Sequence, residues 1–229
     1  MSNNVVSQKR IEAYIDCVSP YSFYAFTYLF RNKKTLDALG VQVEFIPVFL
    51  GGINVGSGNK PPWTLPAKAV YSRYDGERAQ RYFGMKFKIP SFFPIVSLLP
   101  QRCLVYVKRA HPERYEAFFD ACFKTLWLNQ KDISKPGNLK VALLNVFDEQ
   151  EAEAIIRAAD EPEIKQTLAD NTTHAFKNLG AFGCPWFWVF DGKGNAEPFF
   201  GSDRFHFMWQ YLELPHQGFE LIPPTQVKL

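Results

Sequence analysis

The sequence predicts an α/β fold in which a βαβ unit, a large helical insertion and a ββα unit follow one another. A strand pattern at residues 11–18 is followed by a helical stripe at 21–34 and a second strand pattern at 41–50. Residues 65–179 carry helical spacing only, and a strand pattern returns at 185–191. A strand, helix and strand joined by short links predict parallel pairing with a right-handed crossover.

The first unit is defined by a change of period at Ser19-Pro20. Before it, Ile11, Ala13 and Ile15 alternate with polar residues, as in a half-buried strand. After it, the apolar residues lie on one helical stripe: Phe23, Phe26, Leu29 and Phe30.

The middle of the chain predicts one long loop and then helices. Residues 51–63 are rich in Gly, Asn and Pro, so we expect an irregular loop there, long enough to suggest a function. Helical spacing follows at 101–109, 112–128 and 150–159, with a proline-bounded break at 90–100.

The last unit predicts a hairpin and a helix. The strand at 185–191 ends in Gly-Lys-Gly-Asn, which is turn chemistry, and a return strand is expected at 197–200. A final helix is expected at 204–212, with Ser202 or Asp203 as its N-cap. The order predicts one domain built from residues 1–64 and 180–229, and an inserted helical domain at 65–179.

Composition bounds the function. Of the 229 residues, 47% are apolar and 21% charged, which predicts a globular chain. The net charge of +3 is spread along the chain without a basic run, so we expect no nucleic-acid partner. No apolar run approaches membrane-spanning length, and we expect no membrane insertion. The 22 Phe residues indicate an aromatic core or a wide apolar cleft.

The cysteines and histidines predict neither a metal nor a dithiol. Cys17, Cys103, Cys122 and Cys184 are never in C-x-x-C spacing, and the four His residues are scattered. Reduced thiols of an intracellular protein are the expected state. The chain ends in Val-Lys-Leu, a weak match to the Ser-Lys-Leu peroxisomal signal.

Ser19 is the first candidate site residue. It lies where a strand enters a helix, and ligands of open α/β sheets bind at such ends. The helix N-terminus would stabilise an anion there, and the Ser19 hydroxyl could donate a hydrogen bond to a thiolate. The alternative is that Ser19 is only an N-cap, followed by Pro20 at the first helical position.

Three further places carry candidate residues. A cis bond between Cys184 and Pro185 would turn the Cys184 backbone outward to pair with an extended peptide, whereas a trans proline would simply open the strand. Ser202 and Asp203 could hold the α-carboxylate and the ammonium of a ligand. Asn59 and Lys60 offer donors for another carboxylate. Ordinary caps and surface loops are the alternatives for these residues.

Four motifs follow one another and span nearly the whole chain: Ser19-Pro20-Tyr21-Ser22, Ser57-Gly58-Asn59-Lys60-Pro61-Pro62, Gly180-Ala181-Phe182-Gly183-Cys184-Pro185 and Phe200-Gly201-Ser202-Asp203-Arg204. In these motifs and in their order and spacing, the sequence resembles the kappa-class glutathione transferases. The class belongs to the same superfamily as DsbA-type oxidoreductases and 2-hydroxychromene-2-carboxylate isomerases. The resemblance implies a thioredoxin-like fold whose sheet domain, 1–64 with 180–229, binds glutathione.

The resemblance also implies residue roles. Ser19 matches the catalytic serine that hydrogen-bonds the glutathione sulfur. Glutathione contacts are implied for Pro20, Tyr21, Asn59, Lys60, Cys184, Pro185, Ser202 and Asp203. Cys184 departs from relatives with an aliphatic residue there, so either a mixed disulfide with glutathione or a small buried apolar role is open. A homodimer in peroxisomes or mitochondria is implied, with the cytoplasm as the alternative compartment.

The function predicted is conjugation or reduction of small hydrophobic electrophiles with glutathione as co-substrate and no metal. A glutathione-dependent isomerase is the first alternative, because it would use the same serine. A redox-inactive thioredoxin-like module that binds peptides or proteins is the second. A disulfide oxidoreductase is disfavoured, because attack needs a thiolate where this chain has Ser19.

Overall fold

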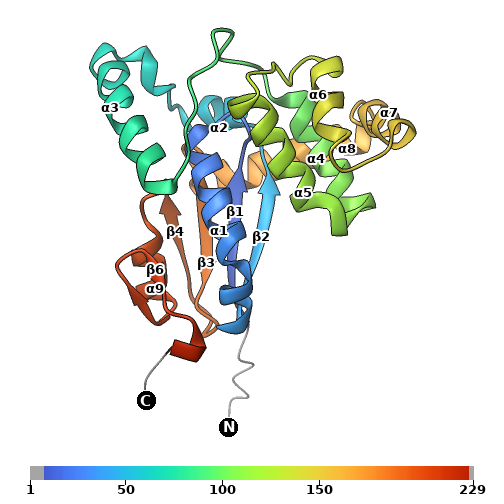
Figure 1. The fold of residues 1–229 in the computed structure, drawn as a ribbon. Coiled ribbons are helices and arrows are strands. Elements are labelled where there is room, and N and C mark those ends of the chain that lie inside the picture. Colours follow the sequence, from blue (N-terminus) through green and yellow to red (C-terminus); the bar gives the residue numbers. More distant parts are fainter. Residues whose placement is uncertain (1–7, 227–229) are drawn as a thin grey trace.

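The computed structural model describes residues 8–226. The tripeptide Val227-Lys228-Leu229, on which the peroxisomal prediction rests, lies outside the described residues. A four-stranded sheet in the order β2-β1-β3-β4 forms the centre of the fold (Figure 1). Its strands are β1 (Lys9–Ile15), β2 (Val41–Pro47), β3 (Trp186–Phe190) and β4 (Ala196–Phe200). The helices are α1 (Pro20–Ala38), α2 (Leu50–Ser57), α3 (Pro66–Phe83), α4 (Leu98–Ala110), α5 (Pro112–Phe123), α6 (Pro136–Leu143), α7 (Glu149–Ala158), α8 (Pro162–Thr173) and α9 (Phe205–Tyr211).

The sheet topology confirms the predicted order of units. β1 pairs with β2 in parallel through the crossover helix α1, and β1 pairs antiparallel with β3. β3 and β4 form the predicted hairpin. Residues 48–185, all of them described, contain no strand. Figure 1 shows α1 across the sheet, helices α4 to α8 gathered on the β2 side, and α3 standing apart on the β4 side.

The strand ends differ from the prediction for a local reason. β1 was expected at residues 11–18 but ends at Ile15, because the chain then makes a turn closed by a 3.0 Å bond from the Ser19 N–H to the Asp16 carbonyl. β2 ends at Pro47, since Leu50 already begins α2.

The Phe-rich composition builds the core. Phe23 of α1 stacks on Phe123 of α5 at a ring-centroid distance of 5.1 Å, and Phe119 stacks on the same Phe123 at 5.2 Å. The largest apolar cluster contains strand residues such as Ile11 together with insertion residues such as Leu139. The division into two domains stays a prediction, and a shared core joins its two sides.

The prediction of an irregular loop at 51–63 is wrong for its first half. Residues Leu50–Ser57 form α2, and a turn of 3₁₀-helix follows at Pro62–Thr64. The glycines of α2 serve close packing: a Cβ on Gly52 would lie 2.9 Å from Thr172, and one on Gly56 would lie 2.5 Å from the Phe176 ring. The glycines on which the loop prediction rested are therefore explained by close neighbours of the helix α2, which leave little room for side chains.

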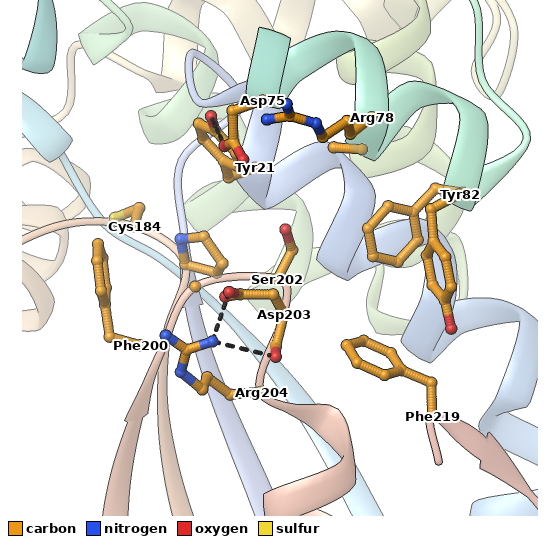
Figure 2. Close-up of a pocket in the computed structure, with 14 residues that line it drawn as sticks. Tyr21, Asp75, Arg78, Tyr82, Cys184, Phe200, Ser202, Asp203, Arg204 and Phe219 are labelled. Atoms are coloured by element: carbon orange, nitrogen blue, oxygen red, sulfur yellow. Dashed lines mark hydrogen bonds and ion pairs between the residues drawn. The ribbon is translucent and has the colours of Figure 1, made fainter. Parts of the chain in front are cut away.

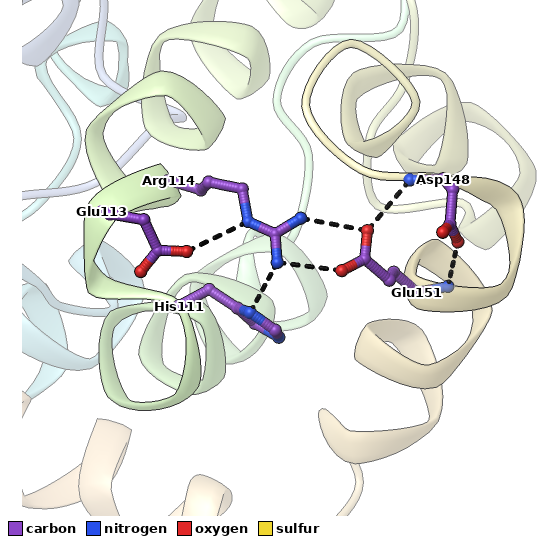
Figure 3. Close-up of polar contacts among 5 residues, drawn as sticks. All are labelled: His111, Glu113, Arg114, Asp148 and Glu151. Carbon is purple, nitrogen blue, oxygen red and sulfur yellow. Dashed lines mark hydrogen bonds and ion pairs between the residues drawn. The ribbon is translucent and has the colours of Figure 1, made fainter.

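A charged cluster holds two insertion helices together (Figure 3). Arg114 of α5 donates to both carboxylate oxygens of Glu151 of α7, at 3.0 and 2.8 Å. Glu151 also accepts from the Asp148 N–H, while Asp148 accepts from the Glu151 N–H, so the pair forms a capping box at the start of α7. Arg114 therefore ties α5 to the first turn of α7.

The C-terminal end carries an element that the sequence analysis did not predict. After α9, the two short strands β5 (His216–Gln217) and β6 (Glu220–Leu221) pair antiparallel. The loop between them includes Phe219, whose carbonyl accepts a 2.9 Å bond from the Trp209 indole N–H and a short bond from the Tyr28 hydroxyl. This hairpin places Phe219 beside α1 and α3.

Candidate active site

Ser19 is the N-cap of α1, with Pro20 in the first turn. Its Oγ accepts a 3.1 Å hydrogen bond from the Ser22 N–H and donates one of 3.0 Å to the Cys184 carbonyl. The side chain is buried, with 4% of the residue exposed. The capping interpretation is therefore realised, and the same hydroxyl also reaches the second predicted motif. A contact with a sulfur atom stays a prediction.

The peptide bond between Cys184 and Pro185 is cis, and β3 begins at the next residue, Trp186. Among the described residues no acceptor takes the Cys184 N–H. The Pro185 carbonyl accepts a 3.1 Å bond from the Gly201 N–H. The two bonds from Ser19 and Gly201 thus bring three distant segments to one place.

The Cys184 thiol lies among apolar neighbours. Only 7% of the residue is exposed, and it packs in a cluster with Tyr14, Val48 and Trp186. Burial raises the pKa of the thiol well above its usual value, and the charge of Asp16 adds to this. A neutral thiol that packs as a small apolar group is the state that these surroundings favour.

A cavity of about 500 Å³ opens beside these segments. Figure 2 shows α3 on one side and the turn with Ser202 on the other. The lining residues are Tyr21, Asp75, Arg78, Ala79, Tyr82, Phe83, Cys184, Pro185, Phe200, Gly201, Ser202, Asp203, Arg204 and Phe219. Of the predicted site residues, the cavity brings together Tyr21, Cys184, Pro185, Ser202 and Asp203. Its aromatic side chains make it an apolar site with a few charged groups.

Sequence reasoning missed the wall that α3 supplies. Asp75, Arg78, Ala79 and Tyr82 follow the spacing i, i+3, i+4, i+7, so one face of α3 looks into the cavity. The Tyr21 hydroxyl donates a 2.7 Å bond to Asp75 and so joins α1 to α3. Burial, and then that bond, raise the pKa of Tyr21 above its usual value. The helical spacing places these four residues on one face, but nothing local in the sequence shows that this face turns toward the cavity.

The turn before α9 corrects one prediction. α9 begins at Phe205 with Arg204 as its N-cap, and no side chain caps it. The expectation that Ser202 or Asp203 caps this helix is wrong, because Gly201, with φ +92°, turns the chain toward Pro185 and places both residues ahead of the helix. Ser202 is buried beside the cavity, whereas Asp203 is exposed and pairs with Arg204.

Asn59 and Lys60 lie outside the cavity lining. The Asn59 amide donates a 2.5 Å bond to the Phe182 carbonyl, two residues before Cys184. Both Asn59 and Lys60 are exposed. The structure thus brings Asn59 alongside the segment that leads to the cis-proline, and it gives Lys60 no hydrogen bond or ion pair within residues 8–226.

A buried carboxyl lies beneath the site. Asp16 is fully buried and accepts from the Val18 N–H at 3.0 Å, the Leu50 N–H at 2.8 Å and the Ser97 hydroxyl at 2.7 Å. It therefore links the starts of α1, α2 and α4. Burial raises the pKa of Asp16 to about 6, although the three donors act in the opposite direction. In the sequence Asp16 reads only as a polar member of an alternating strand.

The sequence of this chain matches a known family model. The model describes a DSBA-like thioredoxin domain and matches residues 10–213. The chain belongs to this DSBA-like family. The matched segment includes every predicted site residue and both sides of the helical insertion.

Two proteins similar to this DSBA-like chain are both named glutathione S-transferase kappa 1. "Glutathione S-transferase kappa 1" of Caenorhabditis elegans is 29% identical over 211 residues, which is 90% of this chain and 92% of that protein. The Homo sapiens protein of the same name is 29% identical over 223 residues, 95% and 96% of the two chains. The solved structure of a 2-hydroxychromene-2-carboxylate isomerase has a TM-score of 0.71 at 18% identity, covering 89% of this chain and 94% of the other, and supports the fold.

Residues 8–226 contain no group of three or more His, Cys, Asp or Glu side chains placed to hold a metal ion. Nor does any helix within that range have the length and apolarity needed to cross a membrane.

Proposed function

We propose that this chain is a kappa-type glutathione transferase. It binds glutathione in an extended form beside the Cys184–Pro185 peptide and uses the thiolate to conjugate or reduce small hydrophobic electrophiles. The observation that carries the proposal is the buried Ser19 hydroxyl at the start of α1, which lies 3.0 Å from the carbonyl of Cys184, a residue that lines the aromatic cavity. The two relatives named glutathione S-transferase kappa 1 support it.

The groups around the cavity fit the charges of glutathione. The free Cys184 N–H can donate a hydrogen bond to a backbone carbonyl of the cysteinyl unit of an extended peptide. Ser202 and Asp203 offer a hydroxyl and a carboxylate to the γ-glutamyl end. Asn59 and Lys60, at the other side of the cis-proline segment, are proposed for the glycyl carboxylate.

Ser19 and the first turn of α1 would lower the pKa of the bound thiol. The first N–H groups of a helix have no intrahelical acceptor, and they carry a partial positive charge that favours a thiolate. The Ser19 O–H would turn from the Cys184 carbonyl to the sulfur. The thiol proton leaves to solvent, the sulfur attacks the electrophile, and no covalent enzyme intermediate is needed.

The test is a pH titration of the bound thiol. The ultraviolet absorbance of the thiolate is followed on the wild-type complex with glutathione and on Ser19→Ala, together with kcat/KM for an aryl chloride. We expect Ser19→Ala to raise the thiol pKa by about one unit or more and to lower kcat/KM by about 10- to 100-fold, because a hydrogen bond to a charged group is lost.

Ser22→Ala is the matched control. Ser22 is buried three residues away on the same helix, and its hydroxyl has no hydrogen-bond partner within the described residues. It should leave the thiol pKa unchanged. An equal pKa in wild type and Ser19→Ala would refute the role of Ser19, and turnover without consumption of glutathione would point to an isomerase instead.

The electrophile, the assembly and the compartment are part of the same proposal. We propose detoxification of reactive small molecules by a homodimer in peroxisomes or mitochondria, with the cytoplasm as the alternative. Sedimentation of the purified protein tests the dimer, and microscopy of the chain with and without residues 227–229 tests peroxisomal import.

A further inference from the structure

The face of α3 that looks into the cavity has two ends of different chemistry. Tyr82 lies within 5.1 Å of the Phe83 and Phe219 rings, measured between centroids, and forms an aromatic end. One and two helical turns earlier, Arg78 and Asp75 form a charged end (Figure 2). Arg78 and Tyr82 are four residues apart, so their side chains are neighbours on the helix surface.

The charged groups of the cavity are paired, with one exception. Asp203 pairs with Arg204, and Asp75 accepts the Tyr21 hydroxyl at 2.7 Å. The Arg78 side chain forms neither an ion pair nor a hydrogen bond with any residue in the range 8–226. Arg78 is exposed at the cavity, so its N–H donors are open to a ligand, and their planar fork matches a carboxylate.

The proposed binding of glutathione leaves Arg78 unused. Ser202 and Asp203 are assigned to the γ-glutamyl end, and Asn59 with Lys60 to the glycyl carboxylate. Arg78 lines the cavity from the opposite wall, beside aromatic side chains that suit a flat ring.

We propose that Arg78 selects aromatic electrophiles that carry a carboxylate. The ring packs against Tyr82 and Phe219, and the carboxylate binds the Arg78 guanidinium. This inference rests on the proposed glutathione transfer and names its second substrate. For an aryl chloride, the thiolate sulfur bonds to the ring carbon that carries chlorine, and chloride leaves with the bonding electron pair. The thiol proton has already gone to solvent.

The experiment compares a chloronitrobenzoate with a neutral chlorodinitrobenzene in wild type, Arg78→Gln, Arg78→Lys and Arg81→Gln. The ratio of the kcat/KM value for the benzoate to that for the neutral chloride is compared between variants, because the intrinsic reactivities of the two chlorides are the same in each. We expect Arg78→Gln to lower this ratio about tenfold through KM for the benzoate, with KM for glutathione unchanged. Arg78→Lys should restore part of it. Arg81 lies on the same helix and outside the cavity lining, so Arg81→Gln should leave the ratio unchanged.

A second measurement separates this inference from the proposed function. Binding of nitrobenzoate to the protein saturated with S-methylglutathione is measured by calorimetry for the same variants, without turnover. Weaker binding of nitrobenzoate to Arg78→Gln, with unchanged binding to Arg81→Gln, supports the role of Arg78 even if neither chloride reacts. A failure of both chlorides to react would refute glutathione transfer to aryl chlorides without touching the role of Arg78 in binding. An unchanged ratio with unchanged binding overturns the role of Arg78. So does an equal loss for both chlorides with a raised KM for glutathione, because Arg78 would then bind glutathione itself.

Discussion

Asp16 is a fully buried carboxyl with no cation among its hydrogen-bond partners, and its replacement by Asn should change how stability depends on pH. Burial raises the pKa of Asp16 to about 6, against about 3.9 in an unfolded chain. The folded protein therefore holds the proton between about pH 4 and pH 6, where the unfolded chain has released it. Stability from this group is complete below pH 4 and is lost as the pH rises through 6.

The size of the effect follows from the two pKa values. A difference of about two pKa units corresponds to about 3 kcal/mol in the free energy of unfolding, fully lost by about pH 7. Asn cannot ionise, so the stability of wild type relative to Asp16→Asn should fall by about that amount between pH 4 and pH 7. Any hydrogen bond that Asn makes less well adds a constant offset and leaves the slope unchanged.

The assay is urea unfolding followed by tryptophan fluorescence at several pH values between 4 and 8. Asp191→Asn is the control for a carboxyl whose pKa shifts the other way, because the Asn195 amide and the N–H groups of Lys193 and Asn195 lower the pKa of Asp191. Its contribution is fully present above the unfolded pKa of about 3.9 and is lost only below it, so its difference curve should stay flat between about pH 5 and pH 8. A flat difference curve for Asp16→Asn, or one that rises with pH, would refute the reasoning.

Two further predictions concern packing and the insertion. Gly56→Ala should destabilise the protein by about 1–3 kcal/mol, because the new Cβ meets the Phe176 ring. Gly76→Ala lies inside α3 with no atom within 4 Å of the new Cβ, and it should stabilise the protein by about 0.5–1 kcal/mol. Urea unfolding measures both changes, and equal effects would contradict the packing argument. Arg114→Leu should lower the melting temperature by releasing α5 from α7. Because Arg114 lowers the pKa of Glu151, the difference in melting temperature between wild type and variant should shrink as the pH falls below about 4. A difference that stays constant with pH would show that the ion pair contributes little.

The order of the main units was predictable because the strands of the sheet and the helix α1 show their own periods in the sequence. The β1–α1–β2 unit and the β3–β4 hairpin depend on local alternation and turn residues, which the structure retains. α2 was missed because its glycines weaken any helical signal, and its packing against Thr172 and Phe176 involves residues more than a hundred positions later. Such tertiary contacts override propensity and are not visible in a local window.

Part of the candidate site was predictable because its residues lie at the ends of strands, which local sequence patterns mark. Ser19 and the cis-proline segment stand at strand ends, where local punctuation shows them. Arg78 and Asp75 lie on a helix that could face anywhere, and the bond between Tyr21 and Asp75 turns that face toward the cavity. Asp16 reads as an ordinary polar strand residue until α2 and α4 bring their donors to it.

The position of Ser19 explains how an N-cap can also serve a substrate. Its oxygen accepts from the Ser22 N–H, which fixes the side chain and leaves the O–H to point away from the helix. The only described acceptor in that direction is the carbonyl of Cys184, the residue whose N–H is free. A cysteinyl unit paired with the Cys184 backbone would bring its sulfur to the same place, so the hydroxyl exchanges one acceptor for another and the cap stays intact. Under the proposed function, the helix start would be preorganised for the thiolate of glutathione before the substrate arrives.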